Sequence, residues 1–547
     1  MENQRLFLIG AIFFTGFLLW QEWQTKDTKL TPTTNSVKQI TQEKSQNNTS
    51  INSNDGLPQT FNEYKEEVKN NEFSSNTQSS SPFISIKTDL FTAKISTQGG
   101  TIESVYLSNF PVSLEDKENK IQLIKNKEGE VFKIQSGLLP AKILPTHQSI
   151  YRSEKLFYDL EGKNKLVVSL LWQENDIKVI KNFTFKRDSY LIDIDYQISN
   201  TSNKTITAQS YVRLAKNKPR EQSRKMGARI YNGGAIYNEK DKYSKIDFED
   251  FGKVKNTQAV GGWMAMVQHY FLVAVLPNEQ KNNRYTNDVF DGLYRLSLVN
   301  EAKQIPAKKT VSTDSNKIFI GPKEQARLVK LPEELDRTVD YGFLYIIAKP
   351  LSWLLNQIHS FVNSWGWSII LLTVLIKLVF YKLSETSYRS MAGMRKLTPK
   401  IQRLKETYGE DKQKLSQKMM ALYKEEKINP AAGCLPILVQ IPVFISLYWV
   451  LLDSVELRQN SFWWLSDLST QDPYYILPLI MGASMFVQQK LNPQPADPMQ
   501  AKVMAFLPII FTIFFLWFPS GLVLYWVVNN VLSIAQQWII TKRIDAT

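Results

Sequence analysis

The chain has 547 residues, of which 43% are hydrophobic, and a formal net charge of +14. A single cysteine excludes a disulfide-stapled fold, and three histidines are too few for a histidine-rich metal cluster. The average composition hides two unlike parts, because long apolar runs are confined to the N-terminal end and the last third of the chain.

The N-terminal end, residues 1–23, contains an apolar run at 6–20 that predicts a first membrane span. No small-x-small cleavage motif follows Trp20, so an uncleaved signal anchor is favoured over a cleaved signal peptide. Residues 24–81 are rich in Asn, Gln, Ser and Thr and hold too few apolar side chains to offset the entropy of ordering. This segment is predicted to be a disordered exported linker.

Residues 82–338 change to a period-two alternation of apolar and polar side chains, as at 83–88, 90–96 and 191–198. Turn signals such as Gly99-Gly100 separate these runs. The pattern predicts a large antiparallel β-sandwich. A domain of roughly 250 residues buries enough surface to fold without disulfides.

The β-domain shows no catalytic signature. His147 and His269 lie far apart in the sequence, without metal-ligand spacing, and neither a Gly-x-Ser-x-Gly elbow nor a phosphate-binding loop is present. We therefore expect no enzymatic activity, although a sandwich fold alone does not assign a function.

The C-terminal part, residues 339–547, begins with an apolar segment at 341–358 that carries Lys349-Pro350 at its centre and Asn356-Gln357 near its end. These polar positions favour a helix lying in the membrane interface over another span. Five further apolar runs follow, at residues 365–381, 435–452, 474–487, 503–518 and 521–540. At about 1.5 Å per residue most approach the length that crosses ~30 Å of hydrocarbon, so six spans are predicted in total.

The orientation of these spans follows from the basic residues of the loops. Residues 384–434 hold eleven Lys or Arg, whereas residues 453–473 hold one against four acidic residues. Since basic loops stay in the cytoplasm, the first loop is predicted inside and the second outside. Six spans then place both termini in the cytoplasm and export the β-domain.

The basic loop itself predicts a cytoplasmic helical hairpin over residues 384–429. Thr398-Pro399 is a helix-start signal, and apolar residues recur at helical spacing before Gly409 and after Asp411. Its basic side chains include Lys400, Arg403, Lys405, Lys412 and Lys414. Composition leaves two interpretations open, a solvated face beside anionic lipid or a docking site for a ribosome or nascent chain. No specific nucleic-acid site is indicated.

Lys377 is a charge inside the second apolar run. Such a residue costs roughly 2.5 to 3.5 kcal/mol on insertion scales, so it must snorkel, pair, or line a wet cavity. It lies about five residues from the predicted cytoplasmic end, within reach of the headgroups. Snorkelling and a groove-lining role are both open on the residues alone.

Five segments of the C-terminal part closely resemble the YidC family of bacterial membrane protein insertases, namely residues 387–402, 429–440, 455–459, 471–478 and 515–525. The exported domain resembles that of the Gram-negative, periplasmic form. The resemblance implies a five-helix insertase core in the inner membrane, with a hydrophilic groove open to the cytoplasm and the lipid. It also implies nascent single-span or short-loop membrane proteins as substrates, inserted alone or with the Sec translocon, without a nucleotide or metal.

The resemblance also assigns candidate site residues. The family places a positive residue, usually arginine, at the position of Lys377, and the groove residues expected here are Lys377, Thr373, Gln440 and Tyr525. Apolar side chains on the third and fifth spans are expected to form a lipid-facing slide for the substrate: Ile437, Phe444, Leu447, Phe506, Phe511 and Phe514.

Two other classes of function are compatible with part of the pattern. A transporter or channel also places a charge in the membrane, but it predicts repeats and broken spans that the sequence does not show. An envelope scaffold would act through its β-sandwich and use the helices as an anchor. Deleting the sandwich distinguishes an insertase from a scaffold, because an insertase keeps most of its activity and a scaffold loses it.

Overall fold

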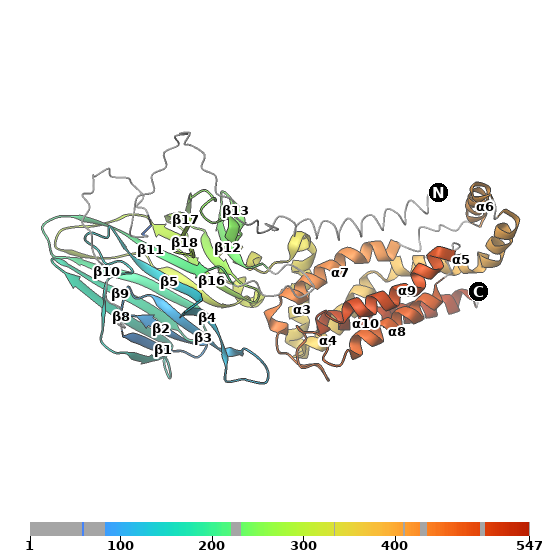
Figure 1. Cartoon of the computed structure of the whole chain (residues 1–547), viewed down its shortest axis with the longest axis horizontal. Helices are drawn as coiled ribbons and strands as arrows, with labels where there is room; N and C mark the ends of the chain where they lie inside the picture. The colour runs from blue at the N-terminus through green and yellow to red at the C-terminus, as the bar shows by residue number, and fades with distance from the viewer. Residues whose placement is uncertain are drawn as a thin grey trace, which may run out of the picture.

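The computed structural model describes residues 57–58, 82–219, 231–332, 334–408, 411–426, 435–492 and 498–545. The first predicted span and nearly all of the predicted linker lie outside these ranges. A β-domain and a helical bundle follow each other along the long axis of the molecule (Figure 1). The two parts coincide with the change from period-two alternation to long apolar runs.

One large sheet of the β-domain contains eleven strands among the described residues. Its pairs are antiparallel except for β1 with β7, which is parallel and departs from the purely antiparallel prediction. In spatial order the strands are β14 (Thr257–Val260), β17 (Asn282–Phe290), β18 (Leu293–Asn300), β11 (Ile206–Asn217), β5 (Glu130–Leu139), β4 (Lys120–Lys127), β3 (Ile102–Pro111), β2 (Phe91–Ser96), β1 (Phe83–Lys87) and β7 (Phe157–Asp159), with β19 (Lys303–Ile305) beside β11.

The second sheet has ten strands in the described part of the chain. In spatial order they are β13 (Lys242–Ile246), β12 (Gly233–Asn238), β15 (Trp263–Val267), β16 (Phe271–Leu276), β21 (Asn316–Pro322), β10 (Leu191–Asn200), β9 (Ile177–Lys186), β8 (Lys165–Glu174) and β6 (Arg152–Ser153), with β20 (Lys309–Ser312) beside β10.

The core of the β-domain lies between the two sheets. Side chains of both, such as Ile134 on β5, Leu214 on β11, Val179 on β9 and Ile194 on β10, are buried in one apolar cluster. Alternation therefore arises because one face of each strand enters this cluster while the other faces outward. The same cluster continues into the helices, so the β-domain and the bundle are packed together.

The helices begin at the junction between the two parts. The short ones are η1 (Phe248–Asp250), α2 (Gln325–Leu328), η2 (Leu335–Thr338), η3 (Gly342–Leu344) and η5 (Val455–Leu457). The long ones are α3 (Tyr345–Val362), α4 (Trp365–Val379), α5 (Tyr381–Tyr408), α6 (Lys412–Glu425), α7 (Leu435–Asp453), α8 (Ile476–Leu491), α9 (Pro498–Phe515) and α10 (Ser520–Asp545). Five of these long helices, α4 and α7–α10, lie within a few residues of the five apolar runs predicted as spans in this part of the chain.

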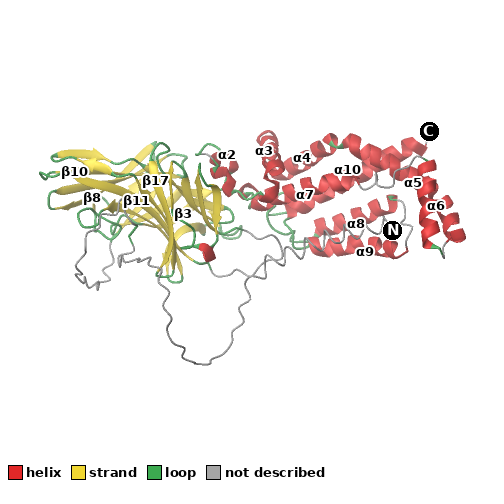
Figure 2. Ribbon diagram, turned by 90° about the horizontal axis from the view of Figure 1, so that it is seen from above, coloured by secondary structure: helices red, strands yellow, loops and turns green. Residues whose placement is uncertain are grey.

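The last helix, α10, is central to the bundle, where it packs against α4, α5, α7 and α8. The hairpin of α5 and α6 and the C-terminal end lie at the end of the bundle away from the sheets (Figure 2). Helix α3 lies at the opposite end, next to the β-domain (Figure 1). The prediction of a helix start at Thr398 is wrong, because α5 runs through Pro399 without interruption.

Two features bear on the predicted spans. Among the described helices, α10 alone is by itself both long and apolar enough to cross a membrane, and α4 meets the same criterion only together with α5, from which it is bent by 67°. The 15 residues of α4 rise roughly 22 Å, which is short of a full ~30 Å hydrocarbon core. The six-span topology therefore stays a prediction.

Candidate functional site

A polar seam runs along one face of α10 inside the bundle. Tyr525, Asn529 and Ser533 are four residues apart and so fall on one side of the helix. That side faces α4 and α7, which supply the partners of the seam. Polar groups between apolar helices are stabilised when they bond to each other.

Lys377 reaches this seam from the last turn of α4. Its Nζ donates a hydrogen bond to Ser533 Oγ at 2.7 Å, and Ser533 Oγ in turn donates to the Asn529 carbonyl oxygen at 2.7 Å. The ammonium is thus directed at α10 inside the bundle. The role of Lys377 as a groove residue stays a prediction.

Gln440, on α7, meets the same face of α10. Its amide donates to the side-chain oxygen of Asn529. Lys377, Gln440 and Ser384 also line one cavity of about 10 Å³, together with Ile376, Phe380, Leu383 and Val439. This space holds about one water molecule, far less than a polypeptide needs, so the described conformation of the seam is closed.

The other two predicted groove residues lie close to the seam. Thr373 is one helical turn before Lys377, is 1% exposed, and donates its hydroxyl to the Ile369 carbonyl oxygen at 2.7 Å. Tyr525 is also buried, and its ring stacks on Phe444 with centroids 6.2 Å apart. Sequence analysis missed Ser533; its spacing of four from Asn529 was the only available signal.

The structure describes the side chains of five of the six predicted slide residues. Phe506 and Phe514, on α9, are 60% and 43% exposed, as expected for side chains that face lipid. Phe444 and Phe511 are partly buried against Trp526, with ring centroids 4.5 and 6.3 Å from it. Leu447 is 1% exposed, so its prediction as a lipid-facing residue is wrong. The side chain of Ile437 lies outside the described residues.

The predicted hairpin is formed by α5 and α6, which pack against each other. Asp411 caps α6 by accepting bonds from the backbone N–H groups of Gln413 and Lys414 at 3.1 and 3.0 Å. Lys400 forms an ion pair with Glu426 that ties the two helices together, and Arg403 and Lys414 are exposed. Lys405 is partly exposed, and the side chain of Lys412 lies outside the described residues.

The bundle is closed at the end that faces the β-domain. The segment after α7 folds over this end, where Ser520 donates from its backbone N–H to the Thr470 carbonyl oxygen and from its hydroxyl to the Asp467 carbonyl oxygen. Phe462 packs directly onto Gly366 of α4, where a Cβ would lie 2.2 Å from the ring. Substitution of this glycine therefore requires the covering segment to move.

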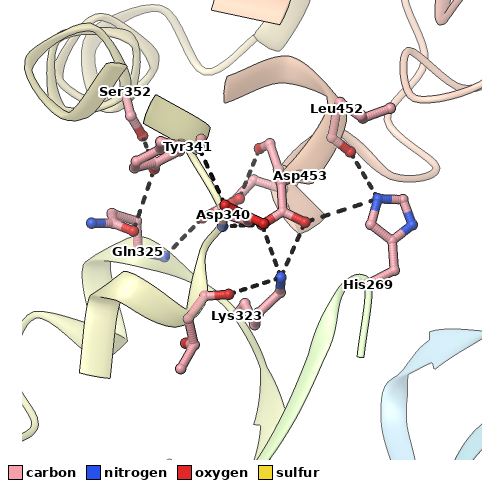
Figure 3. A network of polar contacts seen from close by, with 12 residues as sticks. His269, Lys323, Gln325, Asp340, Tyr341, Ser352, Leu452 and Asp453 are labelled. Carbon is pink, nitrogen blue, oxygen red and sulfur yellow. Dashed lines mark hydrogen bonds and ion pairs between the residues drawn. The ribbon is translucent and has the colours of Figure 1, made fainter. Parts of the chain in front are cut away.

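The β-domain is fastened to this closed end by a buried polar network (Figure 3). Lys323, which follows β21, bonds both carboxylate oxygens of Asp453 at 3.0 and 2.8 Å, and Asp453 also accepts from the Asp340 N–H at 2.8 Å. His269 Nε2 lies 3.1 Å from the Leu452 carbonyl oxygen. Burial, and then the charge of Lys323, lowers the pKa of His269 to about 4, so its imidazole is neutral at pH 7 and donates this bond.

Further contacts extend the junction on both sides. The Tyr341 hydroxyl bonds Ser352 of α3 at 2.8 Å, as Figure 3 shows. The guanidinium of Arg458 donates to the Pro111 and Val112 carbonyl oxygens at 2.8 and 3.0 Å, which joins β3 to the segment after α7. The orientation of the β-domain on the bundle is therefore set by directed bonds as well as by apolar packing.

Two family descriptions match consecutive parts of the chain, "YidC periplasmic domain" over residues 83–354 and "60Kd inner membrane protein" over residues 357–547. The chain is 53% identical over 551 residues to the membrane protein insertase YidC of Vesicomyosocius okutanii, with 100% of both chains covered. It is 54% identical over 563 residues to that of Ruthia magnifica, again with both chains covered completely. The chain belongs to the YidC family of membrane protein insertases.

Among solved structures, an active YidC insertase with its first transmembrane domain resolved matches 83% of this chain and 94% of its own, at 18% identity and a TM-score of 0.38. Full-length identity to YidC insertases confirms the predicted family and the insertase function. It also places the β-domain in the periplasm and the helical part in the inner membrane.

Proposed function

We propose that the seam of Lys377, Gln440, Asn529 and Ser533 is the closed form of a hydrophilic groove through which this insertase admits the polar front of a nascent chain. The observation that carries the proposal is the bond of 2.7 Å from Lys377 Nζ to Ser533 Oγ. It holds a positive charge inside the bundle, where an acidic segment of a substrate would compete for it.

The energetic benefit is local. A polar or acidic segment that enters hydrocarbon directly loses its hydration without any compensation. Beside Lys377 the same segment exchanges water for the ammonium and for the amides and hydroxyls of the seam. Opening breaks the two hydrogen bonds of the seam, which substrate groups or water replace, and separates apolar side chains packed between the helices.

The apolar segment of the substrate would leave along α9. Phe506 and Phe514 present an exposed aromatic surface there, and transfer of an apolar segment into lipid gains about 0.8 kcal/mol per buried CH₂. The short α4 and α8 favour a thinner bilayer beside the groove, since mismatch is relieved by local thinning. Closure of the bundle at the end near Phe462 directs release sideways.

The topology of six spans, with both termini and the α5–α6 hairpin in the cytoplasm, is part of the proposal. Its support is spatial, since the hairpin and the C-terminal end lie at the end of the bundle opposite the periplasmic β-domain (Figure 2). Substrates would be single-span or short-loop proteins, inserted alone or with the Sec translocon. The basic hairpin is the proposed contact for a ribosome or nascent chain.

The test uses the purified full-length protein in vesicles, with matched substrates that differ only in the charge of the translocated tail. Lys377→Arg should retain insertion of all substrates, and Lys377→Ala should slow acidic-tailed ones more than neutral ones. Lys377→Glu should be slowest, since it repels the acidic tail. Protein level and melting temperature are compared for each variant.

Equal insertion by all four proteins would overturn the electrostatic role of Lys377. A uniform loss for acidic and neutral tails alike would also contradict it, because that result indicates damage to the bundle. The family function itself does not depend on the outcome, since it rests on full-length identity to insertases.

A further inference from the structure

The periplasmic β-domain contains a second polar site that is remote from the membrane seam. A cavity of about 270 Å³ lies on the eleven-stranded sheet. Its lining includes Lys133, Gln135, Arg213 and Arg295 from the sheet and Phe290 from the adjoining β17–β18 hairpin. The volume is close to the lower end of the range for small-molecule sites in proteins.

Strand register brings these side chains to one face. Gln135 on β5 is paired directly with Arg213 on β11, which is paired with Ser297 on β18. Paired residues share a face of the sheet, as do residues two positions apart on one strand. Lys133 therefore joins Gln135, and Arg295 joins Ser297, in a single polar row across three neighbouring strands.

Two cations of this row, Arg213 and Arg295, are held in fixed positions. Arg213 is 1% exposed and its Nε donates to Ser297 Oγ at 3.0 Å. Arg295 forms a bidentate ion pair with Asp288 at 2.5 and 2.8 Å, and its guanidinium lies 4.5 Å from the Phe290 ring centroid. Their rotamers are thus set before any ligand binds, which lowers the entropic cost of binding.

The cavity is lined by three cations, Lys133, Arg213 and Arg295, and by two carboxylates, Glu103 and Asp291. Within the described ranges Lys133 has no carboxylate at ion-pair distance, and Glu103, at the rim, already accepts a bond from Asn126 at 3.0 Å. Burial and the charges of Arg213, Lys133, Lys181 and Arg295 lower the pKa of His147, another lining residue, to about 3. Lys133, which has no paired carboxylate within the described ranges, therefore offers an uncompensated positive charge to an anion in the cavity.

The neutral lining adds a second requirement. The side-chain amides of Gln98, Gln135 and Gln148 each offer a donor and an acceptor around the cavity. Side-chain amides can form hydrogen bonds with the hydroxyl groups of a ligand, because a hydroxyl also both donates and accepts a hydrogen bond. Phe290 supplies an apolar wall at the rim.

We propose that this cavity binds a small hydroxylated anion, with the anionic group at Lys133 and the hydroxyls at the surrounding amides. A carboxylate and a phosphate monoester share the required chemistry. The site belongs to the periplasmic domain alone and is independent of the proposed membrane groove.

The test is titration calorimetry of the full-length protein in detergent micelles. The probes are glucuronate and glucose 6-phosphate, with glucose as the neutral control and acetate and inorganic phosphate as anions without a hydroxylated ring. We expect at least one charged sugar to bind at least tenfold tighter than glucose and than its bare anion. The one that binds tighter identifies the anionic group.

The matched variants separate the site from general effects. Lys133→Gln should weaken binding at least fivefold, Lys133→Arg should restore most of it, and Lys165→Gln, an exposed lysine on the other sheet, should change nothing. Melting temperatures show whether each variant folds. The proposal is overturned if neither charged sugar binds at 20 mM, if glucose or the bare anions bind equally well, or if Lys133→Gln and Lys165→Gln have the same effect.

Discussion

Lys323 and Asp453 form a buried ion pair, 2.8 Å apart and with side chains 2% and 8% exposed, that joins the periplasmic domain to the end of α7. The two residues are 130 positions apart in the chain. Asp453 also accepts a hydrogen bond from the Asp340 N–H, and Lys323 also donates one to the Thr338 carbonyl oxygen at 3.2 Å. The Lys323 ammonium and the Asp453 carboxylate therefore form additional hydrogen bonds besides their ion pair. A buried ion pair is tolerated when such bonds compensate for its lost hydration.

Removing one partner of this pair should therefore loosen the junction. We expect Lys323→Met to lower the free energy of local opening by about 3 to 5 kcal/mol, because Asp453 is left buried without its cation. Hydrogen exchange of the backbone around residues 323–345 and 452–458 measures this opening. The matched control is Lys186→Met, which breaks the more exposed pair with Asp193 and should cost at most about 1 kcal/mol. Similar protection in both variants would contradict a fastening role.

The pH dependence of the periplasmic domain should contain a contribution from His147. Its pKa in the folded protein is about 3, mainly because the imidazole is buried, whereas an unfolded histidine titrates near 6.5. Above pH 6.5 the His147 imidazole is neutral in both the folded and the unfolded protein, so it does not reduce the free energy of unfolding. As the pH falls from 6.5 towards 3, only the unfolded state takes up the proton, so the free energy of unfolding decreases, by up to about 3 kcal/mol at pH 4.

Urea unfolding followed by tryptophan fluorescence at pH 7, 5.5 and 4 tests this contribution. His147→Gln cannot take up the proton and should lose less stability over the same interval than the unsubstituted protein. The Tyr211 hydroxyl lies 2.6 Å from His147 Nδ1. Gln at position 147 keeps a polar side chain beside this hydroxyl. Parallel pH profiles for the two proteins would show that His147 does not contribute.

Local sequence patterns predicted the elements well and their partners poorly. The apolar run at 435–452 closely matches α7, because uninterrupted apolar residues mark a buried or lipid-exposed helix whatever its surroundings. The same run does not distinguish the side of the helix that faces lipid from the side that faces other helices. Leu447 was assigned to the wrong side for this reason.

Contacts over long sequence separations were not accessible to the same analysis. Lys377 and Ser533 are 156 residues apart, and only the packing of α4 against α10 makes them partners. The error at Thr398-Pro399 has a related cause, since a local start signal was overridden by a helix that already begins at Tyr381 and packs on α10. Local propensity is a weak determinant when tertiary packing opposes it.

The role of Ser533 in holding Lys377 can be tested separately from the charge. Ser533→Ala removes the hydroxyl that accepts the Lys377 bond but leaves the ammonium in place. We expect insertion of acidic-tailed substrates to slow between about two- and tenfold, less than in Lys377→Ala, since one bond to a charged group is lost. Ser446→Ala is the matched control, because among the described residues that buried hydroxyl bonds only the Pro442 carbonyl oxygen of its own helix, at 2.8 Å. Equal effects of the two serine substitutions would exclude a specific role for Ser533.

The six-span topology predicts opposite accessibility for two loops. With Cys434 replaced, single cysteines at Gln413, in the hairpin, and at Asn460, after α7, should react with a membrane-impermeant thiol reagent from opposite sides of the membrane. Asn460 lies in the segment that covers the end of the bundle near the periplasmic domain. Labelling of both positions from the same side would refute the topology.

The basic surface of the α5–α6 hairpin should mediate docking of a ribosome or nascent chain. The triple substitution of Arg403, Lys405 and Lys414 by Gln removes three positive charges but leaves the Lys400–Glu426 ion pair that ties the hairpin together. We expect cosedimentation with ribosomes to fall severalfold and insertion to slow, and the residual binding to depend less on salt. Replacing Lys155, Lys163 and Lys165 of the β-domain by Gln changes the net charge equally and should affect neither measurement. Unchanged ribosome binding in the hairpin variant would contradict the docking role and favour the other interpretation, in which these charges form a solvated face beside anionic lipid.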